Sequence, residues 1–209
     1  MARRFRRTRR GVTAGLEPGE VELLVGLFED VAGMLDEAAG AGPDAADGAV
    51  PADPLAALER QLTAEPPGPP QDPAVARLLP PASTDDDEAA SDFRRFTQEG
   101  LAARKQQGLR RAAATLRRPA PLLLDDHEAQ AWVRALTDVR LVLAARLGLE
   151  TDDDAALVAL RAEEADADDP VAWTAGVYDF LTWMQEGLTD VLLDALPAEG
   201  RRGRGTGRG

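Results

Sequence analysis

The chain has 209 residues, of which 44% are hydrophobic and 29% are charged, and its formal net charge at pH 7 is −13. It contains no cysteine, which excludes disulfides, thiolate metal sites, cysteine nucleophiles and a thiol redox switch. No apolar run approaches the roughly 20 residues of a membrane-spanning helix, and no apolar stretch follows the first arginines as in a secretory signal, so we expect a soluble cytoplasmic protein.

The first predicted element is a short β-hairpin. The segments FRRT and VTAGL flank a loop that ends in Gly11, and glycine suits the positive φ of a hairpin turn. Because a two-stranded hairpin is marginal alone, Phe5, Val12 and Leu16 are expected to pack on helices. We therefore expect residues 3–16 to be ordered.

The same stretch contains arginines that are candidates for nucleic-acid contact. Residues 1–10 carry six arginines and 201–209 carry four more, whereas 11–200 hold 14 basic and 37 acidic residues, a net charge of −23. The candidate contacts at this end are Arg3, Arg4, Arg6 and Arg7. An acidic body repels a phosphate backbone, so these arginines are expected to lie against that body or against an acidic patch of a partner.

A helix is predicted over 18–38, because proline suits a first turn and apolar residues recur at spacings of three and four. Its stripe consists of Val21, Leu24, Phe28, Val31 and Leu35. Two stretches rich in alanine, glycine, proline and aspartate, 39–53 and 65–73, predict mobile linkers. LAALERQL between them and VARLLP after them are predicted as short helical pieces.

The next helix is predicted over 86–117, and the prolines at 119 and 121 end it. Its inward side chains are Leu101, Leu109, Ala112 and Leu116. The segment 94–118 carries eight positive charges against one acid, and they scatter over three sides of the helix. Pairing with acidic neighbours or with a protein is therefore favoured over DNA contact, for which Arg94 and Arg95 are the candidates.

A helix over 125–148 begins with a capping box, Asp125 with Glu128, and ends near Gly148, which suits a left-handed cap. Its predicted buried stripe is Trp132, Leu136, Val139, Leu143 and Leu147. Thr151 with Asp154 starts a short helix to about 163.

The last helix is predicted over 171–196, after Asp169 and Pro170. Its stripe comprises Trp173, Val177, Phe180, Met184, Leu188, Val191 and Ala195. Because this helix carries two of the three tryptophans, it is predicted to be the spine of the core, with Met184 buried. Residues 1–196 are thus expected to form a single helical domain, and the Gly-Arg tail 197–209 is expected to be disordered.

Charged clusters at the helix starts do not indicate a metal site. His127 lies beside three acids, but adjacent residues at a helix start point in different directions, and no second histidine exists. The acidic runs 84–92 and 150–156 lack the spacing of a calcium loop and are typical of helix capping. We expect no cofactor and no metal, and with one histidine and no cysteine an enzyme has little support.

Polar side chains interrupt two apolar helices. Asp138 and Arg140 lie in one helix, and Tyr178, Asp179 and Gln185 in the other. Buried polar groups must be paired, and a contact of Asp138 or Asp179 with Arg140 would satisfy that need. Such a contact would either fix the register of the helices or form part of a recognition patch between them.

Three stretches together carry a family resemblance: FRRTRRGVTAGLEPGEVELL, LDDHEAQAWVRALTDVRLVLAARLG and VYDFLTWMQEGLTDVLL. The chain resembles the actinobacterial family, formerly of unknown function, to which the oxidative-stress regulator AosR belongs. The residues that match the pattern are Trp132, Asp138, Val139, Arg140, Tyr178, Leu181, Thr182 and Gln185. The resemblance implies a transcription-related regulator that binds a sigma factor or RNA polymerase. Without cysteine, this chain departs from the family's thiol switch.

The sequence thus predicts a mainly α fold, a bundle of four main helices with shorter ones and an N-terminal β-hairpin. The leading function is a non-enzymatic regulator that acts through protein–protein contacts, with Asp138, Arg140, Tyr178, Asp179 and Gln185 as partner-binding residues. One alternative is a DNA-binding regulator that uses its basic tails and the segment 94–118. Another is an adapter or assembly protein outside transcription.

Overall fold

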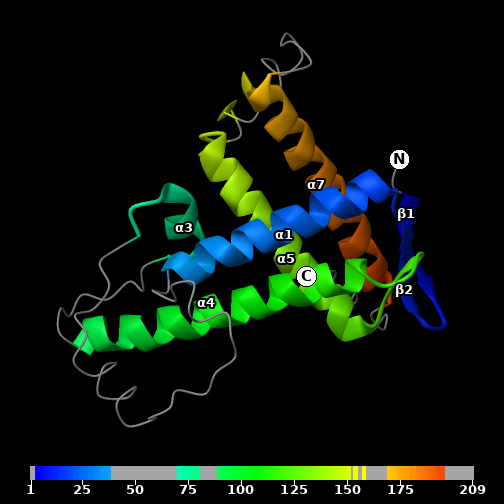
Figure 1. Ribbon diagram of the computed structural model, residues 1–209, viewed down its shortest axis with the longest axis horizontal. Coiled ribbons are helices and arrows are strands. Elements are labelled where there is room, and N and C mark those ends of the chain that lie inside the picture. Colours follow the sequence, from blue (N-terminus) through cyan, green and yellow to red (C-terminus); the bar gives the residue numbers. More distant parts are fainter. Residues whose placement is uncertain are drawn as a thin grey trace, which may run out of the picture.

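The computed structural model describes residues 3–38, 70–80, 89–151, 153–154, 157–158 and 169–195 (Figure 1). Side chains are described in these ranges except at 3–4 and 89–99. The predicted linker 39–53, most of the linker 65–73, the helical piece 55–62 and the tail 197–209 lie outside the described residues. In the described part the fold is mainly helical with a small sheet, as predicted.

The N-terminal hairpin is confirmed, and it belongs to a larger sheet. The strands are β1 (Arg3–Thr8), β2 (Gly11–Gly15) and β3 (Leu122–Leu124). They form an antiparallel sheet in the order β1-β2-β3. Gly11 has φ +132°, and a Cβ there would lie 2.1 Å from the carbonyl oxygen of Leu124. Glycine is therefore needed both for the turn and for the close approach of β3.

Strand β3 is the part of the sheet that the sequence pattern does not predict. Val12 lies opposite Leu124 and Ala14 opposite Leu122, and the hydroxyl of Thr13 donates a 2.8 Å hydrogen bond to the Leu122 carbonyl. Three successive leucines show no alternation of apolar and polar side chains, which is the usual signature of a half-buried strand. Only the tertiary fold reveals the pairing.

The main helices form close to their predicted bounds. They are α1 (Pro18–Ala38), α3 (Pro73–Leu78), α4 (Ala89–Leu116), α5 (Asp126–Arg146) and α7 (Pro170–Asp194). The capping box of Asp125 and Glu128 is present at the start of α5, and Asp169 caps α7. Gly148 has φ +69° after the end of α5, as predicted.

The prediction of a mobile linker over 65–73 is wrong at its C-terminal end, where Asp72 and Pro73 begin helix α3. Asp72 accepts a 2.8 Å hydrogen bond from the backbone N–H of Ala74, and Pro73 occupies the first turn. The pKa of Asp72 is lowered, first by this backbone hydrogen bond and also by Arg146, which lies 2.6 Å away. A proline preceded by an aspartate is a helix start, and here that signal outweighs the linker composition.

The core is centred on α5, not on α7 as predicted. Helix α5 packs against α1, α3, α4 and α7 and against the sheet. Its Trp132 is fully buried and makes edge-to-face contacts with Phe28 at 5.5 Å and Phe5 at 6.3 Å between ring centroids. In Figure 1, α1 and α4 lie side by side, α5 crosses behind them and the sheet closes one end. The two tryptophans of α7 do not make it the centre of the core, because burial of a side chain depends on neighbours on several sides.

The buried stripe of α7 is shorter than predicted. Val177, Leu181, Met184 and Leu188 are buried, which confirms the prediction for Met184. Trp173, however, is 57% exposed, and Ala195 is exposed. Both lie near the ends of the helix, and Figure 1 shows the first turns of α7 extending beyond α1. The direction of Trp173 around the helix suits burial, but no neighbour covers it.

Candidate protein-binding site

Three of the predicted partner-binding residues meet where α5 crosses α7. Arg140 donates from Nη1 to Oε1 of Gln185 at 2.7 Å and from Nη2 to the hydroxyl of Tyr178 at 3.2 Å. Its guanidinium carbon also lies 5.0 Å from the centroid of the Tyr178 ring. Gln185 in turn donates to the hydroxyl of Thr137 at 2.9 Å. These contacts hold the two helices in one register.

The expected pairing of Arg140 with a carboxylate is wrong. Asp138 instead accepts a hydrogen bond from Lys105 of α4, and Asp179 lies exposed on α7. Residues two apart on a helix are about 200° apart around its axis, so Asp138 and Arg140 face different neighbours. Asp138 is only 4% exposed, and burial raises its pKa, although the hydrogen bond from Lys105 acts in the opposite direction.

Arg140 keeps one donor without a partner. Its Nε is buried and forms no hydrogen bond in the described part of the chain. An unpaired buried donor costs free energy, while the other two nitrogens of the guanidinium are satisfied by neutral groups. The contacts of Arg140 with Tyr178 and Gln185 therefore join α5 to α7 but leave one guanidinium donor unused.

Of the arginines predicted as nucleic-acid contacts, Arg6 and Arg7 have described side chains. Arg6 and Arg7 are exposed, and Arg7 forms a 2.6 Å ion pair with Asp126. The side chains of Arg3, Arg4, Arg94 and Arg95 lie outside the described residues.

Later arginines of the same basic segment pair with acids within the chain. These ion pairs join Arg110 to Asp36, Arg117 to Glu29 and Arg118 to Glu128. The predicted pairing of a scattered basic set with acidic neighbours is thus observed for these three.

Aromatic side chains gather instead along one side of α7, where Trp173 is exposed and Phe180 and Trp183 are partly buried against the core. Trp173, Phe180 and Trp183, at spacings of seven and three, form what we call the aromatic face. The rings of Phe180 and Trp183 are stacked, with centroids 6.4 Å apart and planes at 23°. The sequence pattern predicts both Trp173 and Phe180 in the buried stripe; Phe180 does pack partly against the core, whereas the prediction for Trp173 is wrong. The width of the apolar stripe was the signal that could have revealed the aromatic face.

Acidic residues border the aromatic face. A hollow of about 290 Å³ beside Trp173 and Phe180 is also lined by Glu20 of α1. A second, of about 200 Å³ beside Trp183, is lined by Glu186 and Asp190. The charged residues that line these two hollows are all acidic. The face therefore combines apolar surface with negative charge.

The described residues show neither a metal site nor a membrane span. They contain no group of three or more histidine, cysteine or acidic side chains placed to hold a metal ion. Within the same residues, no helix has the length and apolar character needed to cross a membrane. His127 has one described contact, 2.8 Å from its Nδ1 to a guanidinium nitrogen of Arg111.

Residues 2–192 match a family model described as a domain of unknown function, DUF2017. The chain belongs to the DUF2017 family. The match spans the hairpin, the main helices and the aromatic face, and it agrees with the expectation of a family without an assigned function. No curated protein and no solved structure matches this DUF2017 chain. The link to AosR stays a prediction.

Proposed function

We propose that this DUF2017 chain is a non-enzymatic regulator that binds another protein through the aromatic face of α7. The observation that carries the proposal is the 57% exposure of Trp173, which lies in line with the buried Val177 and Met184 of α7 but is itself left uncovered. Exposing a large aromatic side chain to water is unfavourable, and tryptophan is enriched among the residues that dominate binding energy at protein interfaces. Phe180 and Trp183, which are partly buried against the core, lie on the same side of α7 and contribute their uncovered parts.

The charge around the face supports a particular kind of partner. Glu20, Glu186 and Asp190 line the hollows beside the three aromatic rings. Asp179 lies four residues before Trp183 and therefore on the same side of α7. Complementary charge guides association and selects partners. A segment that presents apolar side chains flanked by lysine or arginine fits this surface.

The resemblance to the AosR family supports partners from the transcription apparatus, and a sigma factor or RNA polymerase is therefore the first to test. The absence of cysteine means that any control by oxidation would need chemistry other than a disulfide. We propose regulation by partner binding without a thiol switch.

The described carboxylates with shifted pKa values also support a non-enzymatic role. The pKa values of Asp72 and Asp154 are lowered mainly by backbone hydrogen bonds at helix starts, and that of Glu128 mainly by its hydrogen bond with Arg118. Asp138, whose pKa is raised by burial, is engaged by Lys105. Each of these carboxylates already serves a helix cap or an ion pair.

The test is binding of the full chain to purified sigma factors and to the RNA polymerase core of the same organism, measured by biolayer interferometry. Trp173→Ala is the test variant, and Leu193→Ala is the matched control. Leu193 is 55% exposed on α7 but lies about 160° around the helix from Trp173. We expect Trp173→Ala to weaken binding about tenfold or more and Leu193→Ala to leave it within about twofold.

Two results would contradict parts of the proposal. An equal loss of binding in both variants would show that the aromatic face is not part of the interface. No binding to any sigma factor or to the polymerase would remove the transcription partners. If crosslinking in cell extract then captured a different protein in a Trp173-dependent manner, an adapter role outside transcription would replace them.

A further inference from the structure

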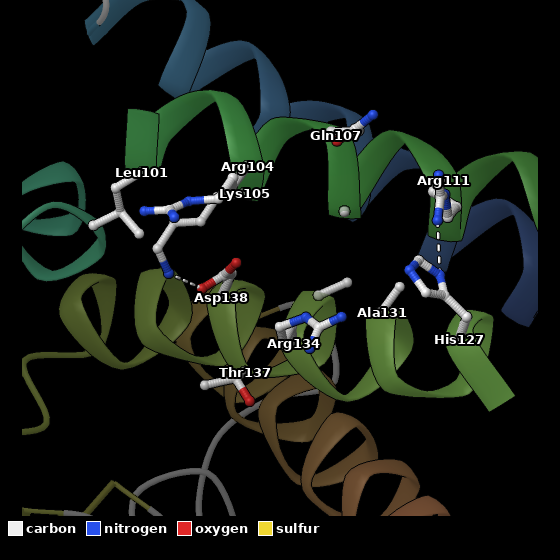
Figure 2. A pocket seen from close by; sticks show the side chains of 12 residues that line it. Leu101, Arg104, Lys105, Gln107, Arg111, His127, Ala131, Arg134, Thr137 and Asp138 are labelled. Atoms are coloured by element: carbon white, nitrogen blue, oxygen red, sulfur yellow. Dashed lines mark hydrogen bonds and ion pairs between the residues drawn. The ribbon is translucent and has the colours of Figure 1, made fainter. Parts of the chain in front are cut away.

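A second site lies on the other side of α5, in the cleft between α4 and α5. Its cavity volume is about 520 Å³, within the range of small-molecule sites. Figure 2 shows polar and charged side chains from the two helices facing one another across it. Arg104, Lys105 and Arg111 come from α4, and Arg134 and Asp138 from α5. None of the aromatic-face residues lines this cleft, and neither do Arg140, Tyr178 and Gln185.

The cleft is open because the residues at its floor are small. Gly108 of α4 and Ala131 and Ala135 of α5 line it. A Cβ placed on Gly108 would meet no atom within 4 Å, so a larger side chain would find room there. Elsewhere along α4 and α5, leucines, valines and a tryptophan fill the space between helices. The cleft thus offers an apolar floor beneath charged walls.

The charge of the cleft is opposite to that of the chain. Arg104, Lys105, Arg111 and Arg134 face a single carboxylate, Asp138, in a protein whose formal net charge is −13. Such a cluster of like charges is unfavourable unless acids neutralise it. An excess of positive charge therefore gathers here.

The three arginines of the cleft differ from Arg110 of α4 and Arg146 of α5. Arg110 and Arg146 pair with carboxylates, whereas Arg104, Arg111 and Arg134 form no ion pair with an acid in the described part of the chain. Among the described side chains, the polar contact of Arg111 is with the ring nitrogen Nδ1 of His127. In a chain with 37 acidic residues, these guanidinium groups remain available to an anion from outside.

Asp138 does not prevent such binding, because its charge is already matched. Its carboxylate is held by the ammonium group of Lys105. The remaining charge of the cleft comes from the three arginines, whose side chains are exposed. A ligand with one negative charge would leave this excess partly uncompensated, and one with several would balance it.

We propose that the cleft between α4 and α5 binds a small molecule that carries two or more phosphate groups, with its phosphates held by the arginines of both helices and its apolar part on the floor of Gly108, Ala131 and Ala135. Guanidinium groups donate paired hydrogen bonds that match phosphate oxygens. The confined volume favours a small ligand over a nucleic-acid strand or an acidic peptide.

The experiment is isothermal titration calorimetry of the full chain with inorganic pyrophosphate at constant ionic strength. Citrate, a carboxylate of comparable charge, is the comparison ligand, and a polyglutamate peptide tests for an acidic protein segment. We expect saturable one-to-one binding of pyrophosphate that is tighter than that of citrate or of the peptide. Absence of saturable binding, or tighter binding of citrate or peptide, would overturn the proposal.

The variants locate the site. Arg134→Gln and Arg111→Gln are expected to weaken pyrophosphate binding by about tenfold each, because each removes a charge-assisted contact. Arg117→Gln is the matched control, since Arg117 is exposed on the same segment, pairs with Glu29 and lies outside the cleft. Equal weakening by Arg117→Gln would show non-specific attraction and refute the site.

Gly108→Leu keeps every charge and fills the floor, so it is expected to abolish binding. Retained binding in a folded Gly108→Leu variant would place the anion elsewhere. Circular dichroism checks the fold of each variant. If the leucine disturbs folding, the exposed arginine variants still decide the question.

Discussion

The indole Nε1 of Trp132 donates a 2.8 Å hydrogen bond to the hydroxyl of Thr115 in the centre of the core. Thr115 in turn donates to the carbonyl of Ala112 at 2.7 Å. Both side chains are at most 1% exposed, so water cannot replace either partner. This pair couples the last turn of α4 to α5 and gives a hydrogen-bond partner to the indole of Trp132, the largest fully buried side chain of the described residues.

Replacing Thr115 with valine is expected to lower the free energy of unfolding by about 1–3 kcal/mol, because the buried indole N–H loses its acceptor. Thr115→Ser keeps the hydroxyl and should cost less than Thr115→Val. Urea unfolding followed by circular dichroism measures both changes. Equal stabilities of the two variants would show that the hydrogen bond contributes little.

Replacing Lys105 with methionine is expected to cost about 3 kcal/mol near neutral pH, because it leaves the carboxylate of Asp138 buried and unpaired. The double variant with Asp138→Leu should recover most of this loss, since a packed apolar pair avoids burying the charge. Urea unfolding of the two variants beside the wild type makes the comparison. A double variant as unstable as the single one would contradict this account.

The same pair predicts a dependence on pH. Burial raises the pKa of Asp138 above its ordinary value of 3.8, so the folded protein holds this proton more tightly than the unfolded chain does. Its contribution to stability is therefore greatest below the unfolded pKa and is lost as pH rises through the folded pKa. Lys105→Met raises the folded pKa further, so the deficit of the variant should shrink on acidification.

For Glu128 the stability depends on pH in the opposite direction. The hydrogen bond from Arg118 is the main cause that lowers the pKa of Glu128 below its ordinary value of 4.5. Its contribution is present above the unfolded pKa and is lost as pH falls through the folded pKa. Glu128→Gln keeps an acceptor for the helix cap but removes the charge, so it should cost about 0.5–1 kcal/mol near neutral pH. Urea unfolding across the acid range should show the difference from wild type disappearing.

Gly11→Ala is expected to destabilise the fold by about 2–4 kcal/mol, because the new Cβ would clash with β3 and the positive φ would be strained. Gly100→Ala in α4 is the control. A Cβ at Gly100 meets nothing within 4 Å, so alanine should stabilise the helix by up to about 1 kcal/mol. Thermal unfolding distinguishes the two, and equal shifts would contradict the role assigned to Gly11.

Local signals predicted the helices well, because caps and periodic apolar residues act within a few positions. The box of Asp125 with Glu128 and the start at Asp169 with Pro170 are examples. Signals that depend on distant neighbours were missed. Strand β3 exists because it pairs with β2, and Trp173 is exposed because no element covers it.

At the candidate sites, too, contacts between helices could not be read fully from local sequence patterns. Arg140, Tyr178 and Gln185 were predicted to be related, and they are joined by hydrogen bonds. The partner of Asp138 was mistaken, because Lys105 lies 33 residues away on another helix. Pairing between helices depends on their crossing geometry, which residue patterns along one helix do not contain.

The pairing of β2 with β3 also has a consequence for protein synthesis. Thr13 and Leu122, which are joined by a hydrogen bond, are 109 residues apart in the chain. At ordinary translation rates β2 would wait roughly 5 to 20 seconds for its partner to be made. During that interval Phe5 and Val12 have no core to cover them. Exposed arginines such as Arg6 on the edge strand β1 would then discourage pairing with other nascent chains.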